Sequence, residues 1–334
     1  MSARRLLTLA LGLAMAAGFV WLIARETDGA ALRAAFAEAR AGWIGLGVLC
    51  FLAGYSARVA RWRAMLALEN PALTWGRCMG PFMISMAVNN VLPFRAGDAL
   101  RAFAFSGRLG VGTGRVLATL VVERLLDLLT ILGILGLALW LTGLDAGGLL
   151  GVGAAALVAA ALAVALALLL PGVFEPLARG GAGLVARLAP GPGARLREES
   201  DRIFALLRRL ARGAVMARLM LWSALAWGLE GCVFLCAALA LPGMAAPEAA
   251  WLALPVGTLA TLLPSTPGYV GTFDYFAAEA VQLFGEPQAV AAAFAILTHT
   301  MLYFPPLAVG GIALLLRPLP KGAAARAASQ SPLP

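Results

Sequence analysis

Residues 89–101 read NNVLPFRAGDALR, a polar stretch inside an apolar region of the chain. It groups two arginines, an aspartate, a proline and a glycine. Proline removes a backbone donor that a helix needs, and glycine permits the backbone angles from which a helix can restart. The stretch therefore predicts two short helices that meet at PFRAG, residues 93–97.

The surrounding sequence is typical of a membrane protein. Of its 334 residues, 61% are hydrophobic and 13% are charged, whereas about a quarter of the residues in soluble proteins are charged. Four runs carry no charged residue, at 6–24, 128–144, 146–174 and 287–316. A helix of about 20 apolar residues crosses a bilayer, and barrel strands would instead alternate polar with apolar residues. We therefore expect an all-α integral membrane protein.

The distribution of charge argues against a nucleic-acid partner. The formal net charge is +9, but the basic residues cluster between apolar runs, as they do in cytoplasmic loops. Four cysteines, Cys50, Cys78, Cys232 and Cys236, lie in apolar surroundings, which favours packing over metal ligation or disulfides. The sequence has no Walker motif and no HExxH. We expect no ATP, no cofactor and no metal.

We expect six spans with both termini in the cytoplasm. Arg4 and Arg5 precede the first span, which is retained rather than cleaved, and Arg58, Arg61 and Arg63 mark the inner end of the second. Segment 28–41 is predicted to be a short amphipathic helix outside, and 321–334 a disordered tail. The predicted spans are 6–24, 43–65, 115–142, 147–170, 218–241 and 288–316.

Two further segments are predicted to be re-entrant hairpins, at 77–106 and 249–284. Had 77–93 crossed alone, the loop 171–218, with nine arginines and four acids, would lie outside, which the positive-inside rule disfavours. The second pair, 249–263 and 268–284, is broken by PSTPG. Two thin crossings for each pair remain the alternative.

The two breaks resemble each other, since LPFRAG (92–97) and LPSTPG (263–268) share Leu-Pro, three residues and Gly. We interpret residues 1–145 and 146–320 as an inverted-topology repeat within one membrane domain. Broken backbone at membrane depth is tolerated where it is buried in protein or lines a wet cavity. We therefore expect the two tips to meet at a polar site near the midplane, where helix N-termini favour an anion.

These motifs resemble a known family. NNVLPFRAGDALR, VVERLLDLL (121–129) and PSTPGYVGTFDYF (264–276) are similar to the lysylphosphatidylglycerol synthase transmembrane-region family, also described as flippase-like. The resemblance covers about residues 1–320. It implies a lipid-handling protein of the bacterial cytoplasmic membrane. This chain resembles the flippase half of the multiple peptide resistance factor without its synthase domain, so we expect no enzymatic activity.

The candidate substrate-binding residues lie at the two tips. Arg95 and Arg101 suit a phosphate headgroup, because a guanidinium binds phosphate in bidentate fashion; the alternative is that Asp98 and Arg101 pair structurally. The hydroxyls and amides of the second tip suit headgroup oxygens, or serve hairpin geometry alone. The candidates are Asn89, Asn90, Pro93, Arg95, Gly97, Asp98, Arg101, Pro264, Ser265, Thr266, Pro267, Gly268, Tyr269, Gly271 and Thr272.

A second group of candidates forms a coupling or charge network. We expect Glu123 or Asp127, which share a helix face, to contact Arg95 or Arg101; a structural salt-bridge cluster is the alternative. His299, the only histidine, suits a proton switch or plain packing. The candidates are Glu123, Arg124, Asp127, Glu230, Asp274 and His299.

The segment EESDRIFALLRRLARG, residues 198–213, predicts an amphipathic cytoplasmic helix. Its apolar residues are Ile203, Phe204, Leu206, Leu207 and Leu210, and they alternate with arginines. This pattern favours binding to anionic lipids; an ordinary positive-inside loop is the alternative.

Together these features predict a transporter of an anionic or modified lipid: a phospholipid, an aminoacyl-phospholipid, or a polyprenyl- or hopanoid-type lipid. The alternatives are a membrane-embedded lipid-phosphate enzyme and a scaffold for a partner enzyme that modifies lipids.

Overall fold

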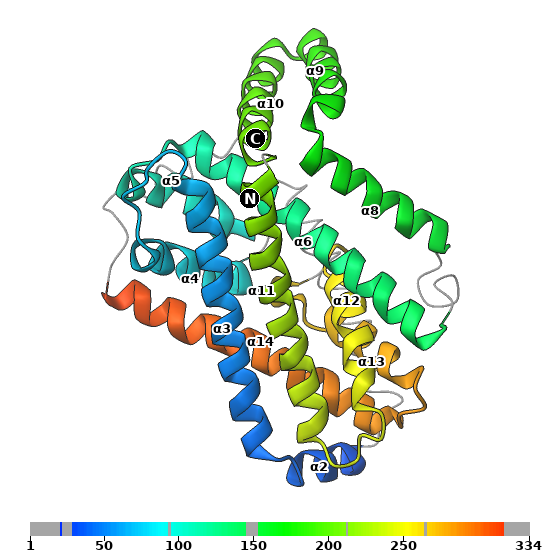
Figure 1. Cartoon of the computed structure of the whole chain (residues 1–334). Coiled ribbons are helices and arrows are strands. Elements are labelled where there is room, and N and C mark those ends of the chain that lie inside the picture. Colours follow the sequence, from blue (N-terminus) through cyan, green and yellow to red (C-terminus); the bar gives the residue numbers. More distant parts are fainter. Residues whose placement is uncertain are drawn as a thin grey trace.

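The computed structural model describes residues 21, 29–92, 95–144, 153–211, 213–263 and 266–316. Within these ranges the regular elements are helices (Figure 1), which confirms the predicted all-α class. Apart from Trp21, the predicted span at 6–24 lies outside the described residues, as do the tail 321–334 and the tip residues Pro93, Pro264 and Ser265.

Four described helices are long and apolar enough to cross a membrane, where the sequence predicted six spans. They are α3 (Ala41–Leu66), α6 (Thr113–Thr142), α11 (Gly213–Ala240) and α14 (Gln288–Leu316). In Figure 1, α14 passes behind α3 and α11, which lie side by side.

The span predicted at 147–170 is described only from residue 153 onward. Its described part, α8 (Ala154–Leu169), has 16 residues, fewer than the roughly 20 of a typical span. The chain then bends by 95° into α9 (Pro171–Leu188). Proline at the first position of α9 has no donor for the preceding turn, which explains why the two helices do not continue as one.

Both predicted breaks are confirmed as interruptions between short packed helices. The first pair is α4 (Trp75–Val91) and α5 (Ala96–Leu109). The second is α12 (Ala250–Ala260) and α13 (Thr272–Gln282), with a single 3-10 turn, η3 (Pro267–Tyr269), between them. Within each pair the two arms pack against each other.

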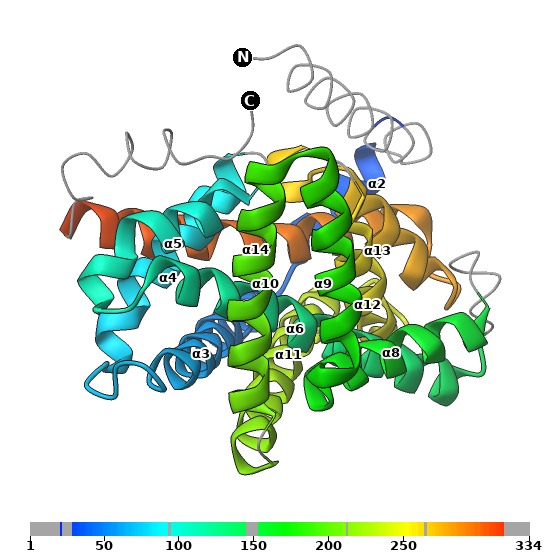
Figure 2. The same ribbon diagram turned by 90° about the horizontal axis from the view of Figure 1, so that it is seen from above.

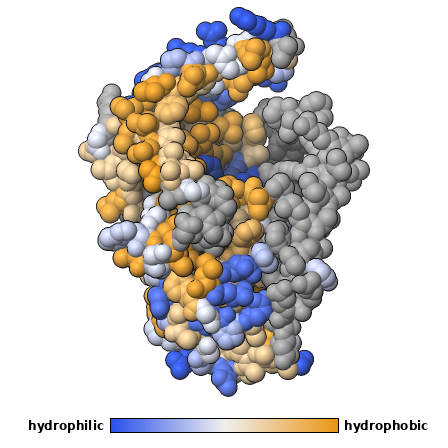
Figure 3. All heavy atoms as spheres, turned by 90° about the vertical axis from the view of Figure 1, so that its right-hand side faces the viewer, coloured by the Kyte–Doolittle hydropathy of each residue, from blue (hydrophilic) through white to orange (hydrophobic). Residues whose placement is uncertain are grey.

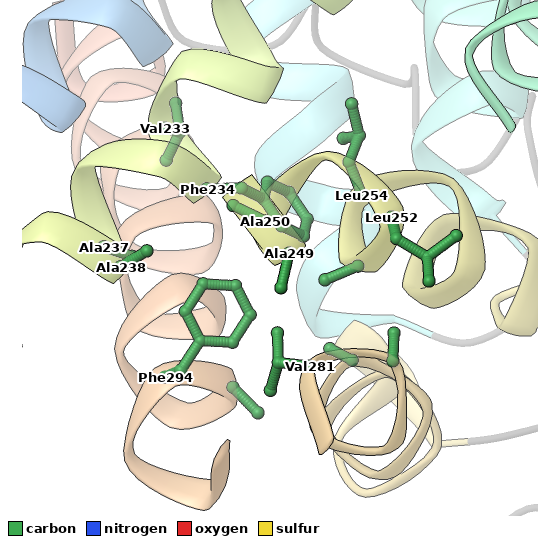
Figure 4. Packing of buried hydrophobic residues seen from close by; sticks show 14 of the residues in the cluster. Val233, Phe234, Ala237, Ala238, Ala249, Ala250, Leu252, Leu254, Val281 and Phe294 are labelled. Atoms are coloured by element: carbon green, nitrogen blue, oxygen red, sulfur yellow. The ribbon is translucent and has the colours of Figure 1, made fainter. Parts of the chain in front are cut away.

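Each helix pair is embedded in a hydrophobic core of its own. The α4–α5 pair packs in a cluster with α3, α6 and α10 (Pro190–Leu210). The α12–α13 pair packs with α11 and α14, where Val233, Phe234, Val281 and Phe294 converge with many alanines (Figure 4). Small side chains let helix backbones approach closely in membrane proteins. Helices α3, α6 and α11 contribute residues to both clusters and so connect the two broken pairs.

Helices α9 and α10 form a hairpin across one end of the bundle (Figures 1 and 2). The helix predicted at 198–213 forms the second half of α10. Its residues Leu206, Leu207 and Leu210 are buried in the protein core and are not available to a lipid surface. Exposed apolar side chains lie instead on α9, at Val173, Leu177 and Leu184.

The remaining elements cap the bundle. Helix α2 (Gly29–Ala37) packs on α14, and a 3-10 turn, η2 (Pro247–Ala249), precedes α12. Figure 3 shows a broad hydrophobic area on one side of the molecule, with hydrophilic residues gathered at its ends and in one patch. Such a large exposed apolar surface is typical of contact with a membrane.

Candidate functional site

The first tip is closed by residues of the opening motif. Asn89 binds the start of α5 twice: its Oδ1 accepts from the Asp98 amide at 3.2 Å, and its Nδ2 donates to Asp98 Oδ1 at 3.0 Å. Gly97 lies so close to α4 that a Cβ there would be 1.9 Å from the Ser85 carbonyl oxygen. Asn89, Gly97 and Asp98, predicted to bind substrate, therefore hold the hairpin together.

The second tip depends on a single histidine. His299 Nδ1 lies 2.7 Å from Asp274 Oδ1, and Nε2 lies 2.9 Å from the Gly268 carbonyl oxygen. Asp274 Oδ2 also accepts from the Gly271 amide at 2.8 Å. Gly268 and Gly271 have φ of +74° and +85°, angles that glycine adopts without strain. The structure thus joins two predicted network residues, and α14 holds the turn that precedes α13.

The other predicted residues of the second tip have less specific surroundings. Thr266 donates to the Val270 carbonyl at 3.2 Å, inside the turn itself. Thr272 is fully buried, and its hydroxyl has no partner among the described atoms. Pro264 and Ser265, and the side chain of Pro267, lie outside what the structure describes.

The two tips touch, as the sequence predicts. Arg95 Nε donates to the Tyr269 hydroxyl at 3.2 Å. Asn90 Nδ2 donates to the Tyr303 carbonyl at 3.2 Å, and the Tyr303 hydroxyl lies 3.4 Å from the Asn90 carbonyl. A Cβ on Gly268 would be 2.5 Å from the Tyr303 ring. One polar region therefore joins α4, α5, η3 and α14.

A buried ion pair lies behind the first tip. Arg101 NH2 lies 2.7 Å from Glu123 Oε2 and 3.6 Å from Asp98 Oδ1. Its guanidinium also faces the rings of Trp62 and Phe82, each 4.8 Å away. The predicted contact of Glu123 with Arg101 is confirmed. Because Arg101 is 0% exposed, its geometry favours the structural alternative over a direct contact with a headgroup.

A second buried network connects α3, α6 and α11. Asp127 Oδ1 accepts from Arg61 NH1 at 2.8 Å and from Trp227 Nε1 at 3.1 Å. Arg58 pairs with Glu230 and stacks 4.3 Å from the Trp227 ring. A buried charge needs such partners to offset its desolvation.

Sequence reasoning used Arg58 and Arg61 only as markers of the inner end of the second span and missed their ion pairs. Both are buried in ion pairs. Arg63 instead contacts the loop that follows the helix, since it donates to the Leu73 carbonyl at 2.7 Å. A signal was available, because positions 58 and 61 share a helix face while 63 lies on another.

Other features contribute less to the site. A cavity of about 510 Å³ lies between the start of α6 and α10, away from the tips. Its arginines, Arg115 and Arg202, are already paired with nearby glutamates. The four cysteines are free thiols. In the described ranges, no group of three or more His, Cys, Asp or Glu side chains is arranged to hold a metal ion.

Comparison with known proteins gives a family and one distant relative. The model of a family described as "Lysylphosphatidylglycerol synthase TM region" matches residues 9–310. The glycosyltransferase AglD of Haloferax volcanii is 30% identical over 144 residues. That match spans 43% of this chain and 23% of the relative, so the chain covers under a quarter of that protein.

Proposed function

Because the chain belongs to the lysylphosphatidylglycerol synthase transmembrane-region family, we propose that it is a lipid transporter whose substrate site lies where the two tips meet. The observation that carries this proposal is the contact of Arg95 with Tyr269. It joins two broken helix pairs, and discontinuous helices of this kind bind substrate in secondary transporters. The proposal gives the chain no chemical reaction of its own.

The contact between the tips is suited to opening. Its polar part consists of three described hydrogen bonds. The two between Asn90 and Tyr303 join uncharged groups and contribute about 0.5–1.5 kcal/mol each, and the bond from Arg95 contributes about 1.5–3 kcal/mol. A headgroup oxygen can replace the Tyr269 hydroxyl as the acceptor for Arg95. Net transport then requires that the lipid bind the two states with different affinity.

The proposal extends to topology. Both pairs are re-entrant, the halves form an inverted repeat, and both termini lie in the cytoplasm of a bacterial cell, with the chain in its inner membrane. Support comes from the separate cores around the two pairs and from the arginine-rich α9–α10 hairpin, which the positive-inside rule places in the cytoplasm. There α9 presents its exposed apolar residues to a leaflet that contains anionic lipids.

Coupling is assigned to the second tip. Glu123, Asp127 and Glu230 each have an arginine partner, whereas Asp274 faces a histidine, the side chain best suited to exchange a proton. His299 binds both Asp274 and the tip carbonyl. A change at His299 therefore acts directly on the position of Gly268.

The proposal is tested with the full chain in vesicles that contain acyl-labelled fluorescent phosphatidylglycerol. Dithionite bleaches dye in the outer leaflet, so transport appears as faster loss of the protected signal. Arg95→Ala is expected to slow transport about tenfold, because a hydrogen bond to a charged group is worth about 1.5–3 kcal/mol. Arg179→Ala, on the exposed side of α9, is the matched control and keeps the wild-type rate.

Two results would contradict the proposal. A wild-type rate for Arg95→Ala, with an unchanged melting temperature, removes Arg95 from the site. Failure of the wild-type protein to move phosphatidylglycerol, aminoacylated phosphatidylglycerol, a polyprenyl phosphate or a hexosyl diacylglycerol faster than protein-free vesicles removes the transport function.

A further inference from the structure

The arginines near the two tips fall into two groups. Arg58, Arg61 and Arg101 each lie within hydrogen-bonding distance of a carboxylate. All three are buried. Their charges are therefore neutralised inside the protein, and these guanidinium groups are enclosed. Arg95 and Arg124 differ from them in both respects.

Arg95 has a neutral partner. Its Nε donates to the phenol of Tyr269, and no Asp or Glu of the described ranges forms a salt bridge with it. The undescribed tip residues, Pro93, Phe94, Pro264 and Ser265, carry no charge. The positive charge at the first tip is thus without a counter-ion from either tip.

Arg124 is positively charged and accessible in the middle of a candidate span. Its NH2 lies 3.8 Å from Glu123 and 3.7 Å from Asp127, beyond hydrogen-bonding distance, and each carboxylate has a nearer guanidinium. Its side chain is 45% exposed, against 10% or less for the three enclosed arginines. Charged residues within a span face the bundle interior or a water-filled cavity.

Both arginines act at the same end of α5. Arg95 immediately precedes the helix, and Asp98 lies in its first turn. Arg124 NH2 lies 3.8 Å from the Glu123 oxygen that Arg101 contacts, and Arg101 in turn lies 3.6 Å from Asp98. The first tip and its supporting helices contain five arginines, namely 58, 61, 95, 101 and 124, and four carboxylates, namely Asp98, Glu123, Asp127 and Glu230. Asp274, at the other tip, has donors of its own.

We infer that Arg95 and Arg124 together bind the headgroup phosphate of the transported lipid, and that this headgroup is anionic and carries no amine. The inference rests on the proposed transport function and specifies the substrate of that site. Guanidinium groups bind phosphate through paired hydrogen bonds. Two guanidinium groups that have no hydrogen-bonded carboxylate favour a phosphodiester or phosphomonoester. The ammonium of an aminoacylated headgroup would lie beside two cations and be repelled.

The experiment compares four probe lipids in the same dithionite assay, each carrying the dye on its hydrocarbon tail. Phosphatidylglycerol and a polyprenyl phosphate are expected to move at least about tenfold faster than aminoacylated phosphatidylglycerol or a hexosyl diacylglycerol. Arg124→Gln is expected to slow the two anionic lipids about tenfold and to remove most of this preference. Arg124→Lys retains the charge and keeps the preference.

The outcomes separate the inference from the proposed function. If aminoacylated or uncharged lipid moves as fast as anionic lipid, the inference is overturned while transport stands. If Arg124→Gln slows all moving lipids equally and lowers the melting temperature, Arg124 only supports Glu123 and Asp127, and its assignment to the headgroup is wrong. If no lipid moves, transport itself fails. Arg179→Gln is the control for loss of an exposed arginine.

Discussion

At the scale of single residues, backbone strain coincides with the contact between the tips. Arg95 and Tyr269 are the two non-glycine residues with positive φ in the part of the chain that the structure describes, at 51° and 62°. The left-handed conformation costs an ordinary residue about 1–2 kcal/mol. Their side chains bind each other. Strained residues cluster at functional sites, so the strain supports a functional role for this contact.

The contacts of His299 determine which of its ring nitrogens carries a proton. The Gly268 carbonyl can only accept, so His299 Nε2 must carry a proton to make its 2.9 Å contact. Protein labelled with ¹⁵N-histidine and purified without a histidine tag gives a spectrum from one ring, since the chain has one histidine. We expect Nε2 to be protonated in the wild type. Asp274→Asn should change mainly the Nδ1 signal and leave Nε2 protonated. A neutral ring protonated at Nδ1 alone would contradict the geometry.

Residue contacts were predictable where spacing and charge restricted the choices. The pairing of Glu123 with Arg101 follows from burying charges in apolar helices, where an opposite charge is the available partner. The roles of Arg58 and Arg61 were missed because the positive-inside rule counts charges and ignores helix faces. The contact between Arg95 and Tyr269 joins residues 174 positions apart, and no local pattern identifies such a pair.

At the scale of elements, the first helix pair depends on close backbone approach. Helix α5 meets α4 at Gly97, where side-chain volume is excluded by the Ser85 carbonyl. The hydrogen bonds from Asn89 to Asp98 fasten the same crossing. The glycine of the motif therefore matters for packing as well as for the turn before it.

Two glycine substitutions on α5 test this packing. Gly97→Ala should destabilise the protein by about 1–3 kcal/mol, as overpacking does, because the added Cβ meets backbone. Gly107→Ala, on the same helix, has open space and should be neutral or stabilising by up to about 1 kcal/mol, because alanine is the better helix former. Melting of both variants in detergent measures the difference. Equal melting temperatures would show that α5 can move away from α4 without penalty.

The sequence predicts where helices end better than it predicts what packs against them. The breaks at 92–95 and 261–271 follow from proline and glycine, which act locally. The amphipathic pattern of α10 predicts an apolar face, but a neighbouring helix or a lipid can cover such a face equally well. In the structure α6 packs against α10, so Leu206 and Leu207 are buried in protein.

At the scale of the whole molecule, the two broken pairs meet at their tips and along the packing of α4 against α14. Each broken pair is held in an apolar cluster, whereas the tips are joined by a few hydrogen bonds. The repeated Leu-Pro-x-x-x-Gly pattern predicted that the tips meet, and the structure confirms this. Opposite sides of approach and depth in the bilayer stay predictions, because they depend on the lipid phase as well as on the chain.

The weak contact between the tips predicts that locking it stops transport. Asn90→Cys/Tyr303→Cys, with the four native cysteines replaced by alanine, places thiols on two residues that bind each other. A short bis-methanethiosulfonate reagent should abolish most lipid movement, and dithiothreitol should restore it. Arg179→Cys/Asp201→Cys joins an equally close pair, at 3.0 Å, on the α9–α10 hairpin; cross-linking there should leave transport unchanged. If the cross-linked protein moves lipid as fast as the same protein after dithiothreitol treatment, the two pairs do not separate during transport. The lipid then takes another route through the molecule.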